Sequence, residues 1–353
     1  MSKVPELDGL RAIAVLPVMA LHFSYLHWVV GGYLGVDLFF VLSGFLITSL
    51  LLAEEARDAS VSLRRFYARR ALRILPPLVA CALLALGLGL TGPAGAAAAT
   101  FFAANMVDSR TLGGLMHTWS LAVEEHFYLA WPLLFLLLGP RRMRFLGWTI
   151  LAVLCVRVVL LSLRLEVYTP TYTRADSLAV GCFAALALAR GPVRLGRWVG
   201  PASLLAIVAC FLLVPWMDFL MRSFGFTLFA IVCAAVIVAA VGHEGPMNRL
   251  LRLPVLQYVG TRSYGLYLYH MPVFLALERF RIEDDARSMA LVTLARVAAT
   301  FAVAELSYRT LERWARGRAT RFRTASYQPP VRIQASSMGI RSVPQNGSPS
   351  TTK

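Results

Sequence analysis

The chain has 353 residues, of which 58% are hydrophobic and only 15% charged, and its mean hydropathy is +0.64. Soluble domains are nearer about half apolar and about a quarter charged, so this composition excludes an ordinary soluble domain and indicates a polytopic membrane protein. The formal net charge is +16, but the basic residues fall between hydrophobic runs and not in one patch, which argues against nucleic acid as a partner.

Apolar runs of membrane-spanning length follow one another along the chain. They lie near residues 10–29, 34–52, 74–92, 121–138, 145–163, 176–189, 199–215, 224–241, 264–278 and 289–306. This pattern predicts an all-α integral membrane protein, a bundle of about ten transmembrane helices embedded in a lipid bilayer.

Basic residues predict the orientation of these spans, because cytoplasmic loops are enriched in arginine and lysine. With the N-terminus in the cytoplasm, the inner segments hold most of the loop arginines. The outer loops then hold only Arg110, Arg164, Arg174, Arg222, Arg279, Arg281 and Arg287. Both termini are therefore predicted to be cytoplasmic, in a protein of the cell (plasma or inner) membrane.

The sequence divides into a membrane domain, 1–323, and a polar tail, 324–353, that is rich in Ser and Pro and is predicted to be a disordered cytoplasmic segment. No removable signal peptide is expected at the N-terminus. The cysteines lie inside apolar runs without CxxC spacing, so neither a metal site nor a disulfide framework is predicted.

The first apolar run carries two ionisable side chains, Arg11 and His22. Their spacing is roughly three helical turns, so both lie on one face of the helix, about 16 Å apart along its axis. This spacing places a permanent cation at one membrane surface and an imidazole in the middle of the span. Ionisable groups inside a bilayer are costly and are functional candidates by default, so the pair marks a candidate functional site.

Asp37 lies near the outer start of the second apolar run. A short turn containing Gly31 and Gly32 joins the first two runs, so their helices are predicted to be antiparallel neighbours. Asp37 is expected to hydrogen-bond one nitrogen of His22 and leave the other as a base, as in a His–Asp dyad. The alternative is a structural polar pair that holds the two helices together.

The segment HTWSLAVEEHFYLAWP enters the fourth predicted span from the outside and brings Trp119, Glu124 and Glu125 close together. Neighbours on a helix point about 100° apart, so one of the two carboxylates should face the bundle interior. It would either bind a polar acceptor or pair with an outer arginine such as Arg174.

Two later segments add polar side chains on the same outer side. RADSLAVG contributes Arg174 and Asp176, and SYGLYLYH contributes His270 after Tyr264 and Tyr267 at i, i+3 spacing. Arg174, Asp176 and His270 are expected on the acceptor side. The tyrosines are more typical of an interfacial belt.

Arginines cluster on the inner side in RRFYARRALRILPP. Arg70 and Arg73 are three residues apart and share a helical face, with Arg69 beside them. Clustered guanidinium groups bind phosphate oxygens, so a phosphate-bearing ligand is predicted here. The alternative is positive-inside anchoring or attraction to anionic lipid, but Arg11 on the same side favours a ligand.

Together these segments resemble the acyltransferase-3 family of integral membrane O-acyltransferases. The matching pieces occur in the family's order from residue 6 to about 314: LDGLRAIAVLPVMALHF, GGYLGVDLFFVLSGFLIT, RRALRILP, TWSLAVEEHFYLAWPLL, RADSLAVG, SYGLYLYH and ELSYRTLERW. The resemblance implies that Arg11 and His22 are catalytic and that Arg70 and Arg73 contact the donor. One departure is His126, where the family more often has glutamine.

The resemblance also implies transfer of an acyl group from cytoplasmic acyl-CoA to a hydroxyl of a carbohydrate or glycosylated acceptor, such as a cell-surface glycan or a macrolide-like natural product. Acetyl-CoA is the default co-substrate, and no bound cofactor, metal or extra hydrolase-like domain is expected. One alternative is a transporter or flippase of acylated or lipid-linked substrates, which predicts inverted repeats that the sequence does not display. A receptor or scaffold, the other alternative, leaves the arginine cluster unexplained.

Overall fold

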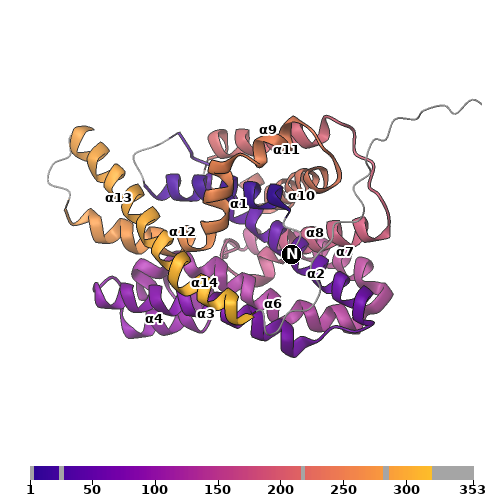
Figure 1. The fold of residues 1–353 in the computed structure, drawn as a ribbon, viewed down its shortest axis with the longest axis horizontal. Coiled ribbons are helices and arrows are strands. Elements are labelled where there is room, and N and C mark those ends of the chain that lie inside the picture. Colours follow the sequence, from indigo (N-terminus) through magenta and orange to yellow (C-terminus); the bar gives the residue numbers. More distant parts are fainter. Residues whose placement is uncertain (1–3, 24–27, 216–218, 281–285, 320–353) are drawn as a thin grey trace, which may run out of the picture.

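A computed structural model describes residues 4–23, 28–215, 219–280 and 286–319. Within these ranges every regular element is a helix, which confirms the predicted all-α class (Figure 1). The predicted tail, 324–353, lies outside the described residues, as do residues 24–27 of the first predicted span.

Helices follow one another along the whole described chain, and single 3-10 or π turns among them are labelled η. In chain order the elements are α1 (Pro5–His22), η1 (Gly32–Leu34), α2 (Gly35–Asp58), α3 (Leu63–Gly87), α4 (Pro93–Thr100), η2 (Ala104–Met106), α5 (Ser109–Leu112), η3 (Gly113–Thr118), α6 (Trp119–Leu138), η4 (Gly139–Arg141), α7 (Arg142–Ser162), α8 (Thr171–Arg190), α9 (Val199–Leu213), η5 (Met221–Gly225), α10 (Phe226–Gly242), α11 (Pro246–Leu251), α12 (Pro254–Glu278), α13 (Ala286–Ser307), η6 (Tyr308–Glu312) and α14 (Arg313–Ala319).

Each predicted apolar segment overlaps one of the longer helices. Among the described residues, five helical stretches are long and apolar enough to cross a membrane by length and composition: Gly32–Asp58, Leu63–Gly87, Ser109–Ser162, Met221–Gly242 and Arg287–Ala319. Other helices are shorter or more charged; α1, for example, carries Glu6, Asp8 and Arg11.

The first helix is shorter than the sequence predicts. It ends at His22, and the N–H of Phe23 bonds to the carbonyl oxygen of Met19 as a cap. The chain returns through η1, where a Cβ on Gly32 would overlap the carbonyl of Pro17, so the returning segment packs on the side of α1 and does not extend it. His22 is therefore the last residue of α1 and does not lie in the middle of a span.

The helices pack closely around α2, which contacts α1 on one side and α8 on another. Gly44 of α2 and Gly181 of α8 allow this approach, because a Cβ at Gly44 would overlap the carbonyl oxygen of Leu178 and one at Gly181 that of Val41. Small residues at helix interfaces let backbones approach closely in membrane proteins. On the other side, α1 packs against α12 and α12 against α13.

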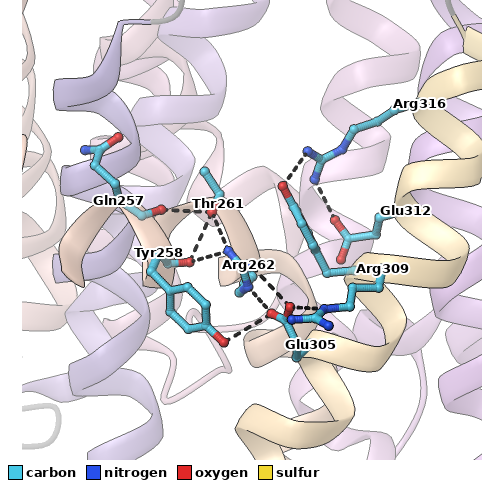
Figure 2. A network of polar contacts seen from close by, with 9 residues as sticks. Gln257, Tyr258, Thr261, Arg262, Glu305, Arg309, Glu312 and Arg316 are labelled. Carbon is cyan, nitrogen blue, oxygen red and sulfur yellow. Dashed lines mark hydrogen bonds and ion pairs between the residues drawn. The ribbon is translucent and has the colours of Figure 1, made fainter. Parts of the chain in front are cut away.

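The last helices are fastened to α12 by a polar network. Figure 1 shows α13 and α14, in orange to yellow, crossing one face of the bundle toward α3, against which α14 packs. In Figure 2, Glu305 accepts hydrogen bonds from Arg262 and from the hydroxyl of Tyr258, the latter at 3.1 Å. Arg316 pairs with Glu312 at 2.9 Å. The contacts of Glu305 hold α13 against α12, and the packing of α14 on α3 places the end of the described chain there.

The close contact between α2 and α8 gives a stability prediction. Gly181→Ala is expected to lower the thermal unfolding midpoint of the detergent-solubilised protein, because the new methyl group forces α8 away from α2 at a cost of about 1–3 kcal/mol. Gly147→Ala is the matched control, since no atom lies within 4 Å of its Cβ position. A Gly181→Ala protein that melts at or above the wild-type midpoint would contradict this packing.

Candidate functional site

A cavity of about 230 Å³ lies between α1, α2, α3, α6 and α12. Arg11 of α1 and two arginines of α3, Arg70 and Arg73, line one end. Ser120 of α6 and Tyr267 of α12 line the other end. α12 runs in the same direction as α1, with Gly260 beside Asp8 and His270 beside His22, so Tyr267 lies far from Arg11. Most of the remaining wall is apolar, so the cavity is a hydrophobic passage with a strongly basic end.

The basic end keeps two guanidinium groups unpaired. Arg11 forms an ion pair with Asp8 at 2.6 Å. Arg70 lies 4.6 Å from the ring centroid of Tyr128, and among the described residues neither Arg70 nor Arg73 has a carboxylate within ion-pair distance. Two unpaired cations beside a cavity can bind an anion such as a phosphate.

Arg69 lies apart from this pair. It does not line the cavity, and its guanidinium contacts the carboxylate of Glu54 at 3.4 Å. Neighbours on a helix point about 100° apart, so Arg69 and Arg70 face different surroundings. Of the three arginines expected to bind the donor, the structure brings only Arg70 and Arg73 to the cavity.

The two adjacent carboxylates of α6 also face different surroundings. Glu124 lines the cavity and accepts hydrogen bonds from the hydroxyl groups of Ser43 and Tyr128, the latter at 2.5 Å. Glu125 is buried, with 8% of its surface exposed, and does not line the cavity. Neither pairs with Arg174, which leaves Glu124 available to a polar group of a ligand.

Asp37 does not contact His22, which corrects the expected His–Asp dyad. Its Oδ1 accepts hydrogen bonds from Arg174 at 2.6 Å and from Ser177 at 2.9 Å. The reason lies in α2: a Cβ on Gly35 would overlap the backbone of α1, so Gly35 faces α1. A side chain two residues further on points about 200° away, which directs Asp37 toward α8.

A second ion pair lies beside the first. Asp176 Oδ2 accepts from Arg157 Nη2 at 2.6 Å and from the hydroxyl of Thr227 at 2.5 Å. Arg174 and Asp176 are fully buried, each at 0% exposure, and do not line the cavity. Their expected place on the acceptor side is therefore corrected: they belong to a charge network that joins α2, α7, α8 and α10.

Trp119 packs beside the buried ion pairs and does not line the cavity. Its ring centroid lies 4.7 Å from that of Tyr168 and 6.3 Å from that of Phe40. Both of these rings lie near the guanidinium of Arg174, at 5.2 and 5.9 Å. The aromatic side chains thus shield the Asp37–Arg174 pair from the cavity.

Three histidines meet beyond the end of the cavity that Tyr267 lines. His270 is central, with ring centroids 5.0 Å from His22 and 4.9 Å from His117. The hydroxyl of Tyr267 donates to the carbonyl oxygen of His117 at 2.8 Å and lies 2.5 Å from the hydroxyl of Ser120. His22 does not itself line the cavity, so Tyr267 separates the cavity from the histidines.

These histidines do not form a metal centre in the described part of the chain. Their rings meet at 47° and 72°, and no three histidine, cysteine or carboxylate side chains there are arranged to hold a metal ion. Proton transfer and hydrogen bonding are the chemistry that such a cluster offers.

Sequence reasoning did not assign several of these residues. His117 and Ser120 stand in segments that the sequence singles out, but their meeting depends on how η3 and α6 pack against α12. Tyr267 was expected in an interfacial belt, whereas it lines the cavity and bonds to the carbonyl oxygen of His117. Ser43 and Tyr128 also stand in quoted segments, but nothing in the sequence distinguishes them from their neighbours. Arg157 could have been found, because an arginine within an apolar run of membrane length indicates a buried, paired charge.

Comparison with known proteins gives the family. The sequence model of the Acyl_transf_3 family, described as "Acyltransferase domain", matches residues 4–309. The chain belongs to this family. No solved structure matches it.

Three curated relatives illustrate the similarity. The putative peptidoglycan O-acetyltransferase YrhL of Bacillus subtilis (strain 168) is 35% identical over 351 residues, covering 88% of this chain and 54% of the relative. The peptidoglycan O-acetyltransferase OatA of Listeria monocytogenes serovar 1/2a is 33% identical over 357 residues, with 88% and 55% covered. The putative O-acetyltransferase SACOL0978 of Staphylococcus aureus (strain COL) is 30% identical over 348 residues, with 88% and 57% covered. The chain spans a little over half the length of these relatives.

The buried pair gives a second stability prediction. Asp37→Ala leaves Arg174 buried without its partner and is expected to destabilise the protein by about 3–5 kcal/mol. Asp37→Ala combined with Arg174→Met removes both charges and should recover much of this loss. Thermal unfolding in detergent measures both variants. A double variant no more stable than Asp37→Ala would show that the two side chains do not stabilise each other.

Proposed function

We propose that this protein is a membrane-bound O-acyltransferase that moves an acyl group, acetyl by default, from cytoplasmic acyl-CoA to a hydroxyl of a cell-envelope glycan. Family membership supports the reaction class. The observation that carries the proposal is a cavity with Arg11, Arg70 and Arg73 at one end and the histidine cluster of His22 just beyond the other.

The proposed topology has ten transmembrane helices in the cell membrane, with both termini in the cytoplasm. It is supported by the overlap of every predicted span with a helix and by the concentration of arginines in alternate loops. In this orientation Arg70 and Arg73 lie on the cytoplasmic side, where acyl-CoA is available.

Arg70 and Arg73 would bind the phosphates of the donor, since no carboxylate of the described chain neutralises them. The long, uncharged pantetheine arm would then follow the apolar cavity past Glu124. The carboxylate of Glu124 can accept a hydrogen bond from an amide N–H of that arm. The proposal therefore assigns Glu124 to the path of the donor, whereas the sequence predicted it on the acceptor side.

His22 would act as the general base. It removes the proton of the acceptor hydroxyl while the hydroxyl oxygen attacks the carbonyl carbon of the thioester. The carbon–sulfur bond then breaks, and the proton passes from His22 to the leaving thiolate, giving an ester and free CoA. A positioned base contributes about 10²–10⁴ in rate.

In a variant of this scheme His22 carries the acyl group covalently between two steps. In either scheme the side chain of Tyr267 has to change rotamer so that the thioester can reach His22.

The acceptor is proposed from the relatives, two of which carry names that specify peptidoglycan. A sugar hydroxyl of a cell-wall glycan is therefore the first acceptor to test. A transporter without chemistry is not favoured, because the family and the named relatives are acyltransferases.

The proposal predicts transfer of label from radioactive acetyl-CoA to a soluble cell-wall glycan fragment by the purified protein. His22→Ala should lower kcat by about 10²–10⁴. Replacing Arg70 and Arg73 together with Met should raise the KM for acetyl-CoA about tenfold or more, because charge-assisted hydrogen bonds to phosphate are lost.

The matched control replaces Arg141 and Arg144 together with Met, which removes the same two charges from exposed positions in η4 and at the start of α7, away from the cavity. It should leave kcat and KM unchanged. Acetyl-CoA binding without turnover, for any hydroxyl acceptor, would favour the transporter. Full transfer by His22→Ala would contradict both catalytic schemes.

A further inference from the structure

The histidine cluster contains a contact that the proposed function leaves unused. His270 is completely buried, and its Nε2 lies 3.2 Å from Nδ1 of His22. Two imidazole nitrogens at this distance form one hydrogen bond, in which one nitrogen carries the hydrogen and the other accepts it.

Two backbone carbonyl groups determine which nitrogen is the donor, because a carbonyl oxygen only accepts hydrogen bonds. Nδ1 of His22 lies 2.9 Å from the carbonyl oxygen of Val18, so this nitrogen carries a hydrogen. Nδ1 of His270 lies 2.5 Å from the carbonyl oxygen of Tyr267 and therefore also carries one.

The remaining nitrogen of His270 follows from this assignment. A neutral imidazole has a single N–H, so with a hydrogen on Nδ1 its Nε2 is an acceptor. It faces Nδ1–H of His22, which divides its hydrogen between Val18 and His270. A doubly protonated His270 would require Nδ1 of His22 to accept, which the contact with Val18 excludes.

We propose that His270 is a positioning residue, which accepts a hydrogen bond from Nδ1–H of His22 and so leaves Nε2 of His22 as the free base. This inference rests on the proposed role of His22 and gives His270 the orienting function that the sequence assigned to Asp37. Nε2 of His22 has no hydrogen-bond partner among the described residues, as a base awaiting a substrate proton requires.

A neutral acceptor suits this place in the bundle. An ionised carboxylate beside His22 would bring a permanent charge into a low-dielectric interior, where charge is costly, whereas the neutral ring of His270 brings none. When His22 takes up a proton during the reaction, its Nδ1–H keeps the same two acceptors, and no group has to rearrange. His117 supports the arrangement from the other side: its Nε2 is bound to the carbonyl oxygen of Leu268 at 3.0 Å, and its ring packs edge-on against His270.

Nitrogen NMR on the full chain, labelled with ¹⁵N-histidine in detergent or lipid, reads the tautomer directly. The His22 signals are assigned by their loss in His22→Gln. We expect a protonated Nδ1 and an unprotonated Nε2 for His22 in the wild-type protein. A hydrogen on Nε2 of His22 overturns the proposal without the need for any variant at position 270.

Two substitutions then connect the tautomer with catalysis. His270→Leu removes the acceptor and should populate the other tautomer of His22 and lower kcat by about 10- to 100-fold, the usual effect of losing an orienting partner. Because donor binding is untouched, the KM for acetyl-CoA should stay the same. His270→Gln places an amide oxygen near the former Nε2 and should restore part of both the tautomer and kcat.

The control is His126→Gln, since His126 bonds to Thr171 and is not part of the cluster. It should change neither the His22 signals nor kcat. If His22→Ala is inactive but His270→Leu keeps the wild-type tautomer and kcat, the role proposed for His270 is wrong. The proposed role of His22 would not be affected by that result. A wild-type protein without acyl transfer would instead overturn the proposed function, while the tautomer would still be measured.

Discussion

The bundle depends on two ion pairs from which water is excluded. Asp37, Arg174, Asp176 and Arg157 all have 0% exposure, and they lie on α2, α7 and α8, with Thr227 of α10 as a further partner. An unpaired charge in such a place costs several kcal/mol. Because each charge has to meet its partner, the pairs fix how α2 and α8 are rotated. The glycine contacts between these helices then set their separation.

The rotation of α2 is what connects this network with the site. With Asp37 directed toward α8, the face that carries Gly35 lies against α1, and Ser43 reaches the cavity beside Glu124. The opposite wall comes from α12, which packs on α1 and brings His270 to His22. Charges that stabilise the fold and charges that face a ligand are therefore separated: the first are paired and buried, and Arg70 and Arg73 are left at one end of the cavity. This separation explains how a strongly basic site exists in an otherwise apolar bundle.

Much of this arrangement could be predicted from helical periodicity, which reports on one helix at a time. It placed Arg11 and His22 on α1 and gave Arg70 and Arg73 a common face, and both of these α3 arginines line the cavity. Helical periodicity does not indicate which neighbouring helix a given face packs against. Asp37 and Arg174 are far apart in sequence, as are His22 and His270, so their contacts depend on tertiary packing. The same limit explains why His22 was expected to bond to Asp37 on the neighbouring helix.

The central claim is that the cavity between the arginines of α3 and Tyr267, which lies beside the histidine cluster, holds the acyl donor. A cryo-electron microscopy structure of the full chain in lipid nanodiscs with a non-reactive thioether analogue of acetyl-CoA tests it most directly. The account predicts phosphate density beside Arg70 and Arg73, the pantetheine arm along the cavity past Glu124, and the acyl end next to Tyr267 and His22. Donor density elsewhere on the protein, with this cavity unchanged, would contradict it.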